Sequence, residues 1–253
     1  MTKPVLLVLM TDFGLNGPYL GQVRAVLARH APRVPVINLL SDLPTCNPLA
    51  SSVLVARYSQ GIEPPAVFLC VVDPGVGGAR RPLIMKSCGR WYVGPENGLL
   101  DRVASVDPEV EIWEITFRPD GISDSFHGRD LFAPVAAHLA SGGAPETVAR
   151  LLSDVRVRDD LDLYEVVYLD HFGNVMTGIQ GKDADTEARL VTEKNGRFEL
   201  SYARTFCEAG TEMPFWYVNG NGLVEIALSC GRAADRLGLD VGDRVDWLSG
   251  VDV

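Results

Sequence analysis

An apolar segment that ends in an acidic residue on a tight turn constrains this chain most. Residues 66–72 are almost entirely apolar, as expected of a strand buried in a sheet, and Asp73 follows them in the run Asp-Pro-Gly-Val-Gly-Gly-Ala-Arg. In open α/β sheets, ligands bind past the carboxyl ends of the strands. Asp73 and Arg80 are therefore candidates to face one site; the alternative is a capping aspartate beside a surface arginine.

Three further polar clusters follow the same logic. The apolar run 5–10 also ends in an acid, Asp12, within Thr-Asp-Phe-Gly, so two strands deliver a carboxylate to one predicted sheet edge. His127 precedes the apolar-periodic segment 131–139, and the partial positive charge at a helix N-terminus lowers an imidazole pKa. The fourth cluster, Asp-His-Phe-Gly-Asn at 170–174, lies in the second half of the chain.

The pattern along the chain predicts an α/β protein with two domains. Apolar strands at 4–10, 34–40, 66–72 and 111–115 alternate with helical patterns at 19–29, 48–58 and 130–140, which indicates a layered, Rossmann-like domain over residues 1–157. Residues 158–163 are predicted to be a linker. Short alternating runs at 164–169, 175–179, 197–202, 215–218 and 223–227 predict a smaller antiparallel, β-barrel-like domain over residues 164–253.

Composition limits the functional classes. The net charge of −10 and a pI near 4.9 argue against a nucleic-acid partner, because a phosphate backbone would be repelled. Five widely spaced cysteines suggest neither a disulfide framework nor a metal site, which favours a reducing cytoplasm. No apolar stretch reaches membrane-spanning length, so no membrane partner is expected. The first apolar run is interpreted as a strand and not as a signal peptide.

Five motifs in order resemble one family. They are Thr-Asp-Phe-Gly at 11–14, Asp-Pro-Gly-Val-Gly at 73–77, Gly-Pro-Glu-Asn-Gly-Leu-Leu at 94–100, Phe-His-Gly-Arg-Asp at 126–130 and Asp-His-Phe-Gly-Asn at 170–174. Together they resemble the S-adenosyl-L-methionine hydroxide adenosyltransferases, relatives of the fluorinating and chlorinating adenosyl enzymes. The resemblance covers about residues 5–248. It implies a homotrimeric hydrolase that converts S-adenosyl-L-methionine into adenosine and L-methionine without a cofactor or metal, with each site shared between two subunits.

The resemblance also implies residue roles. Asp73, Arg80 and His127 are expected to position and activate the attacking water; Asp73 and His127 are potential proton acceptors, and the sequence does not decide between them. In the halogenating relatives the position matching Asp73 is not acidic. A carboxylate there would repel a halide by roughly 4 kcal/mol at about 4 Å and an effective dielectric of about 20, which favours water.

Substrate contacts are expected from both halves of the chain. Asp12 is expected to hold the ribose hydroxyls, Asp170 the methionine ammonium, and Phe206 is a candidate to stack on adenine, with a core aromatic as the alternative. The full set of expected substrate-binding residues is Asp12, Asn97, Phe126, Asp170, Phe172, Asn174, Phe206, Asn219 and Glu225. The chain departs from the family pattern at Gly17, where aspartate is common, and at Gly220, where serine is common.

Two other functions remain open on the sequence. A weakly catalytic protein that binds S-adenosyl-L-methionine or adenosine would account for the departures at Gly17 and Gly220. A metal-dependent hydrolase would use Asp12, Asp73 and His127 as ligands, since carboxylates and imidazole suit divalent metals. Turnover separates the first from the enzyme, and activity in a strong chelator separates the second.

Overall fold

The computed structural model of this chain describes residues 5–152, 162–182 and 184–248. The chain divides into two compact units, Met1–Asp159 and Asp160–Val253, and each has a hydrophobic core of its own. Residues 158–161 of the predicted linker 158–163 lie outside the described residues. Of the rest of that segment, Asp162 precedes the first strand of the second unit and Leu163 begins it.

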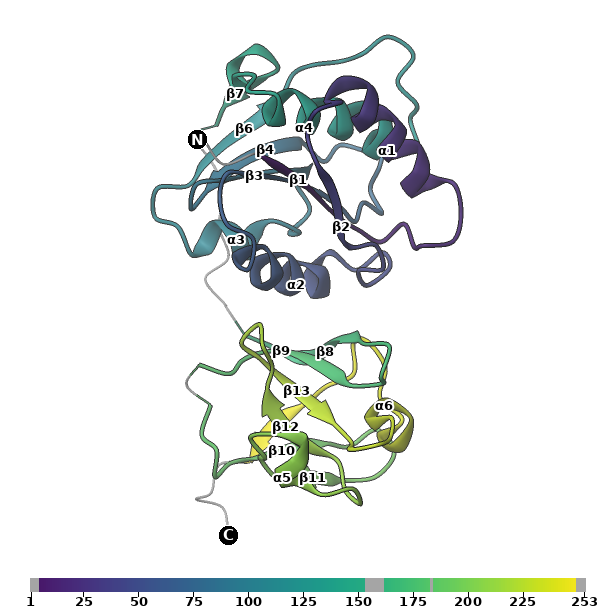
Figure 1. The fold of residues 1–253 in the computed structure, drawn as a ribbon, viewed down its shortest axis with the longest axis vertical. Helices are drawn as coiled ribbons and strands as arrows, with labels where there is room; N and C mark the ends of the chain where they lie inside the picture. The colour runs from purple at the N-terminus through teal and green to yellow at the C-terminus, as the bar shows by residue number, and fades with distance from the viewer. Residues whose placement is uncertain (1–4, 153–161, 183, 249–253) are drawn as a thin grey trace. The chain divides into compact units, whose positions relative to one another are not determined.

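A seven-stranded sheet forms the centre of the first unit (Figure 1). Its strand order is β2-β1-β3-β5-β4-β6-β7, in which β2, β1, β3 and β5 are mutually parallel, whereas β4, β6 and β7 pair antiparallel. The strands are β1 Leu6–Thr11, β2 Val36–Leu40, β3 Ala66–Val71, β4 Pro82–Ser87, β5 Arg90–Pro95, β6 Glu111–Ile115 and β7 Ala149–Leu151. The sheet is therefore mixed, and it bears out a layered α/β arrangement without the finer Rossmann-like description.

Helices lie on both faces of this sheet, with α1 and α4 on one side and α2 and α3 on the other (Figure 1). Their bounds are α1 Tyr19–His30, α2 Pro48–Gln60, α3 Asp101–Ser105 and α4 Ala133–Ala140, with a π-helical turn at Gly128–Phe132 and a 3₁₀ turn at Pro145–Thr147. Asn47 caps α2: its side chain accepts from the backbone N–H of Ala50, and Pro48 occupies the first turn. The predicted helix 130–140 is thus a π turn followed by α4.

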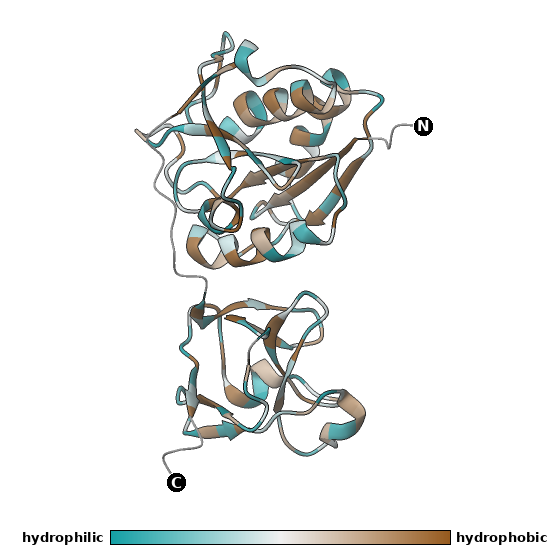
Figure 2. Cartoon of the chain, turned by 90° about the vertical axis from the view of Figure 1, so that its left-hand side faces the viewer, coloured by the Kyte–Doolittle hydropathy of each residue, from teal (hydrophilic) through white to brown (hydrophobic). Residues whose placement is uncertain are grey.

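Spacing of apolar residues explains the layering. Leu20, Val23 and Leu27 recur at helical intervals and are the buried residues of α1, which join a core that includes Leu7 and Leu69 of the sheet. Every residue of β3 is buried, because β1 and β5 flank this strand and helices cover both faces. Figure 2 shows the hydrophobic strands enclosed by helices whose outer faces are more polar.

The second unit is built from two antiparallel sheets. One has the order β12-β13-β9-β8 and the other the order β11-β10-β14. Its elements are β8 Leu163–Leu169, β9 Val175–Gln180, β10 Arg189–Thr192, β11 Phe198–Leu200, α5 Phe206–Ala209, β12 Phe215–Val218, β13 Leu223–Ala227, α6 Ala233–Leu237 and β14 Asp246–Leu248. Trp216 on β12 is fully buried and meets Trp247 on β14 at 4.9 Å between ring centroids, so the core connects the two sheets.

The antiparallel character of this unit is as predicted, but the barrel is not. Over the described residues the two sheets remain separate and no closed barrel forms. Closure would need continuous pairing around the ring, whereas Tyr202 and Trp216 contribute only an isolated bridge. The strands β10 and β14, which the sequence pattern did not predict, supply most of the second sheet.

Candidate functional site

Asp12 and Asp73 meet at the carboxyl ends of neighbouring parallel strands. Thr11 of β1 lies opposite Val71 of β3, and the backbone N–H of Asp12 donates to the Val71 carbonyl at 3.3 Å. Both aspartates line a cavity of about 100 Å³. Its other lining residues are Phe13, Cys46, Val71, Pro74, Val76, Ser125, Phe126, His127 and Gly128. The sheet edge predicted from the two apolar runs therefore exists, and it opens onto a cavity.

Arg80 links Asp73 to His127. Its Nε lies 3.0 and 3.1 Å from the two carboxylate oxygens of Asp73, and its Nη2 lies 2.5 Å from Oδ2. The same Nη2 lies 2.9 Å from Nδ1 of His127. The Arg80 and Asp73 side chains are only 10% and 5% exposed, so this charge pair is held away from water. Charge-assisted contacts of this kind fix the relative orientation of their partners.

The contact with Arg80 fixes the tautomer of His127. A guanidinium donates hydrogen bonds and accepts none, so Nδ1 of His127 must be the unprotonated, accepting nitrogen. The ring proton then resides on Nε2. Burial, and next the positive charge of Arg80, lower the pKa of His127 below its ordinary value, which keeps the ring neutral. In this state His127 donates through Nε2 and does not accept a proton at Nδ1.

Close packing of two loops brings these residues together. Gly77 has φ +77°, and a Cβ at this position would lie 2.4 Å from the backbone oxygen of Asp124. Only glycine permits that approach without a backbone shift. The loop that carries Arg80 is thereby pressed against the loop that ends at His127. His127 itself is the residue immediately before the π turn Gly128–Phe132, close to the predicted helix start.

A backbone hydrogen bond holds the Asp12 carboxylate, and burial makes this carboxylate more basic. Its Oδ2 accepts from the backbone N–H of Cys46 at 3.0 Å. Burial raises the pKa of Asp12, which the Cys46 hydrogen bond partly offsets and the nearby negative charge of Asp73 increases further. Cys46 has φ +55°, an uncommon value for a residue other than glycine.

A second cavity, of about 690 Å³, lies in the second unit. Its lining residues are Asp170, Phe172, Asn174, Phe206, Tyr217, Glu225, Leu228, Cys230, Gly231 and Arg232. Asn174 donates to both carboxylate oxygens of Asp170, through its backbone N–H at 2.8 Å and its side-chain amide at 2.9 Å. Phe172 is 71% exposed and Phe206 is 41% exposed, so two aromatic rings face solvent beside a carboxylate.

Glu225 is a buried carboxylate at the same cavity. It is 2% exposed, and it accepts from the Tyr217 hydroxyl at 2.5 Å and the Asn219 amide at 2.7 Å. Burial raises the pKa of Glu225, and those two hydrogen bonds partly offset the rise. Its side chain therefore belongs to the interior wall of the cavity and is not the outward strand residue that alternation alone would also allow.

Two family descriptions match the two units in order. Residues 7–149 match the description "SAM hydroxide adenosyltransferase N-terminal domain", and residues 164–246 match "SAM hydroxide adenosyltransferase C-terminal domain". The chain belongs to the SAM hydroxide adenosyltransferase family. The family membership inferred from the five motifs is therefore confirmed.

Relatives with assigned activities cover nearly the whole chain. A protein named (R)-S-adenosyl-L-methionine hydrolase from Thermus thermophilus is 36% identical over 92% of this chain and 95% of its own length. One of the same name from Salinispora arenicola is 34% identical over 95% and 96% of the two chains. A fluorinase from Nocardia brasiliensis is 25% identical, covering 95% of each chain.

Solved structures give the same picture of the fold. A crystal structure of an uncharacterized conserved protein from Thermotoga maritima has a TM-score of 0.86 and 32% identity, and covers 96% of this chain and 100% of its own. A crystal structure of a conserved hypothetical protein from Thermus thermophilus has a TM-score of 0.75 and 34% identity, and covers 98% of this chain and 100% of its own.

Most of the predicted site residues line the two cavities, but Arg80, Asn97 and Asn219 do not. Arg80 lies behind the first cavity and contacts two residues of its lining. Asn97 donates its amide to the Val72 carbonyl at 2.8 Å, and its Oδ1 accepts from the N–H of Leu99. Asn219 donates to Glu225 and accepts from the backbone of its own turn. The expected direct contact of these two asparagines with substrate stays a prediction.

Phe13, Cys46 and Tyr217 are among the cavity-lining residues that sequence reasoning missed. Tyr217 pairs with Glu225 across β12 and β13, a register that no sequence pattern specifies. Phe13 is the neighbour of Asp12 in the first motif, and that position is the signal that could have identified it. Its ring lies 5.8 Å from that of Phe126, edge to face, which closes one wall of the first cavity.

Metal and membrane features are absent from the part of the chain that the structure describes. No group of three or more His, Cys, Asp or Glu side chains there has an arrangement that would hold a metal ion. Asp12, Asp73 and His127 do share a cavity, but the Arg80 guanidinium contacts both Asp73 and His127 and would repel a cation. Among the same residues, none of the helices has the length and apolar character to cross a membrane.

Proposed function

We propose that this protein hydrolyses S-adenosyl-L-methionine to adenosine and L-methionine, by in-line attack of water at the ribose C5′ atom. Relatives that are 34–36% identical over most of this chain are named (R)-S-adenosyl-L-methionine hydrolase, and the family descriptions agree. The observation that carries the proposal is the contact of one buried guanidinium with Asp73 and with His127 at a cavity that also holds Asp12.

The reaction needs help at the nucleophile and not at the leaving group. Methionine departs from a sulfonium as a neutral thioether, so no acid has to protonate it. Water must instead be placed behind C5′ and lose a proton as the C–O bond forms; placement and base assistance each contribute several kcal/mol to such steps. Atoms balance as the C5′–S bond breaks, the C5′–O bond forms and one proton is released.

The tautomer of His127 assigns different parts to the two groups. Its Nε2–H donates to the water oxygen and so orients the lone pair that attacks. A carboxylate has about four acceptor positions, and Arg80 occupies three of them on Asp73. Asp73 keeps one position for the water and accepts its proton. Arg80 thus fixes the base and the orienting histidine with one side chain. Asp12, held by the backbone of Cys46, binds the ribose hydroxyls.

A carboxylate at the water position also selects the nucleophile. The Arg80 guanidinium is already paired with the Asp73 carboxylate and so is not free to bind a halide. A halide at this position would also be repelled by the negative charge of Asp12, which lies close to Asp73. Repulsion between unit charges is roughly 4 kcal/mol at about 4 Å and an effective dielectric of about 20. Neutral water has no such penalty, which supports hydrolysis over halogenation for this chain.

The second unit supplies the remaining substrate contacts in this proposal. Asp170 pairs with the methionine ammonium, Asn174 and Glu225 contribute hydrogen bonds, and Phe172 and Phe206 offer rings for the adenine. Small-molecule sites are typically lined by aromatic side chains with a few polar groups, and this cavity has both. The cytoplasm is the compartment proposed for the enzyme.

Assembly as a homotrimer, with each site completed by a neighbouring subunit, accompanies this proposal. The ligands fall in two units of the chain, which supports a shared site but does not specify the partner. We expect Asp73→Asn and Asp170→Ala proteins, each with low activity alone, to regain part of the activity when subunits are exchanged. Light scattering should give a trimer. A fully active monomer would contradict the shared site.

Product analysis tests the reaction itself. We expect the purified protein, in the presence of a strong chelator, to form adenosine and methionine in equal amounts, because no proposed step uses a metal. Chromatography of the reaction mixture measures both products. Methylthioadenosine, adenine or a methylated acceptor would contradict the assignment, and binding without turnover would favour the sensing protein instead.

A further inference from the structure

The loop after β5 contacts the residue immediately before the catalytic loop, residues 73–80, which carries Asp73 and Arg80. Asn97 donates its side-chain amide to the Val72 carbonyl at 2.8 Å, and Val72 immediately precedes Asp73. The Oδ1 of Asn97 accepts from Leu99, so the amide is held on both sides. The orientation of the peptide that leads into Asp73 therefore depends on a side chain from the loop after β5.

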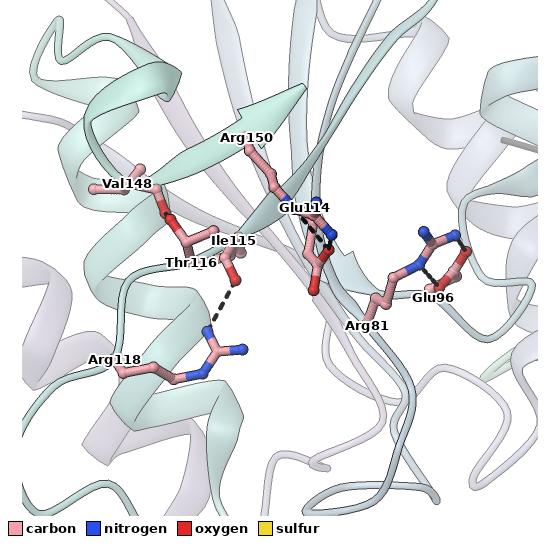
Figure 3. A network of polar contacts seen from close by, with 8 residues as sticks. All are labelled: Arg81, Glu96, Glu114, Ile115, Thr116, Arg118, Val148 and Arg150. Atoms are coloured by element: carbon pink, nitrogen blue, oxygen red, sulfur yellow. Dashed lines mark hydrogen bonds and ion pairs between the residues drawn. The ribbon is translucent and has the colours of Figure 1, made fainter. Parts of the chain in front are cut away.

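The same loop contacts the catalytic loop at its far end. Glu96 accepts from Nε of Arg81 at 2.6 Å and from Nη2 at 2.5 Å, and Arg81 directly follows Arg80 (Figure 3). The backbone N–H of Glu96 also donates to the Arg81 carbonyl at 2.8 Å. Close packing supports this position: a Cβ on Gly94 would lie 2.4 Å from the Cys70 oxygen, so β5 lies directly against β3.

We propose that Glu96 and Asn97 are positioning residues that hold the two ends of the catalytic loop 73–80 and so keep Asp73 and Arg80 in register. The inference rests on the proposed function. Within the loop, Val76 N–H donates to the Asp73 carbonyl and Gly78 N–H to the Gly75 carbonyl, and the Arg80–Asp73 pair joins its two ends. The dipeptide 96–97 fixes where both ends of this loop lie on the sheet. In this proposal Asn97 acts on the loop through the Val72 carbonyl and not on the substrate.

The pair is suited to positioning and not to stability. The Arg81 and Glu96 side chains are 30% and 36% exposed, and ion pairs this exposed add little to the free energy of unfolding. A displacement of about 1 Å at a catalytic group can nevertheless cost about a hundredfold in rate. Loss of the pair should therefore lower kcat while leaving the free energy of unfolding nearly unchanged.

Kinetics of Asn97→Ala and Glu96→Ala test the proposal. We expect kcat to fall about tenfold to a hundredfold with KM for S-adenosyl-L-methionine nearly unchanged, since neither residue touches substrate. The matched control is Glu114→Ala, which removes the partner of Arg150, a second Arg–Glu pair on the same sheet (Figure 3). That variant should keep the parental kcat. A raised KM with parental kcat would overturn the proposal in favour of direct binding.

The effect of Asn97→Ala in the absence of the Asp73 carboxylate distinguishes a positioning role from a general loss of activity. In an Asp73→Asn background the base is already gone, so adding Asn97→Ala should lower the residual kcat by much less than it lowers the parental one. An equal fold-loss in both backgrounds would show that Asn97 acts elsewhere, and would overturn the proposal.

A measurement made without substrate tests the positioning role independently of the proposed hydrolysis. In protein with nitrogen-labelled arginine, the Nε–H of Arg80 should give a slowly exchanging signal, because it donates to both oxygens of Asp73. We expect Asn97→Ala or Glu96→Ala to broaden or average that signal, and Glu114→Ala to leave it unchanged. An unaltered Arg80 signal in both the Asn97 and the Glu96 variant would overturn the proposal even if hydrolysis is confirmed.

Discussion

Replacing Asp73 with Asn is expected to lower kcat for S-adenosyl-L-methionine hydrolysis by about a hundredfold to ten-thousandfold, the range typical of general-base assistance. The substitution keeps the size of the side chain but removes the charge and basicity that accept the proton from water. KM should change little, because the adenosine and methionine contacts are assigned to other residues. Steady-state kinetics of the parent and the variant measure both constants.

Binding of adenosine serves as the control for this variant. Calorimetry should give nearly parental affinity, which shows that the cavity is intact while turnover is lost. Kinetics of Asp73→Asn in high chloride provide an additional test, because removal of the carboxylate lifts part of the electrostatic repulsion against a halide. If Asp73→Asn hydrolyses the donor at the parental rate, Asp73 is structural and the water site lies elsewhere.

Arg80→Ala is expected to lower kcat to a similar extent, for a different reason. It leaves Asp73 without its cation and His127 without the donor that fixes its tautomer. Combining it with His127→Ala should cost much less than the sum of the two single losses, because residues that act as a unit are not additive. A strictly additive double variant would contradict a linked Asp73–Arg80–His127 unit.

The pH dependence of the same variant has a definite direction. Arg80 lowers the pKa of His127, so its removal lets that pKa rise, and the ring becomes protonated at a higher pH than in the parent. Burial, the larger cause, remains. Titration of the His127 ring signals by nuclear magnetic resonance measures this shift directly, without reference to turnover. A lower pKa of His127 in Arg80→Ala would contradict the effect assigned to the Arg80 charge.

Some of the architecture was predictable because buried parallel strands have an unambiguous sequence pattern. The runs that form β1 and β3 are continuous and apolar, and each ends in a carboxylate, so their shared edge followed from general rules for α/β sheets. The start of α2 was equally clear from Asn47 and Pro48. Those same rules brought Asp12 and Asp73 to one cavity.

Much of the antiparallel half of the first sheet was not predicted. Strands β4 and β5 form a hairpin whose two-residue turn is Cys88-Gly89, with φ of 47° and 74°. Asparagine or aspartate before glycine is the usual signal for such a turn, and cysteine is not. Without that hairpin there is no reason to place residues 96–97 beside the catalytic loop, so no pattern in the sequence indicates the contact of Asn97 with the Val72 carbonyl.

Proton roles at the site also needed the three-dimensional structure. The sequence allowed either Asp73 or His127 to accept a proton from water, because both residue types can do so. Only the contact between Arg80 Nη2 and His127 Nδ1 shows which ring nitrogen accepts. Long-range contacts of this kind, 47 positions apart in the chain, leave no local pattern in the sequence.

The most direct test of the account is hydrolysis in water enriched in the heavy isotope of oxygen, with the products analysed by mass spectrometry. Attack of water at C5′ predicts one labelled oxygen in adenosine, located at the 5′ position, and an unlabelled methionine. Label in an amino-acid product, or adenosine without label, would contradict attack at C5′ and with it the roles given to Asp73, Arg80 and His127.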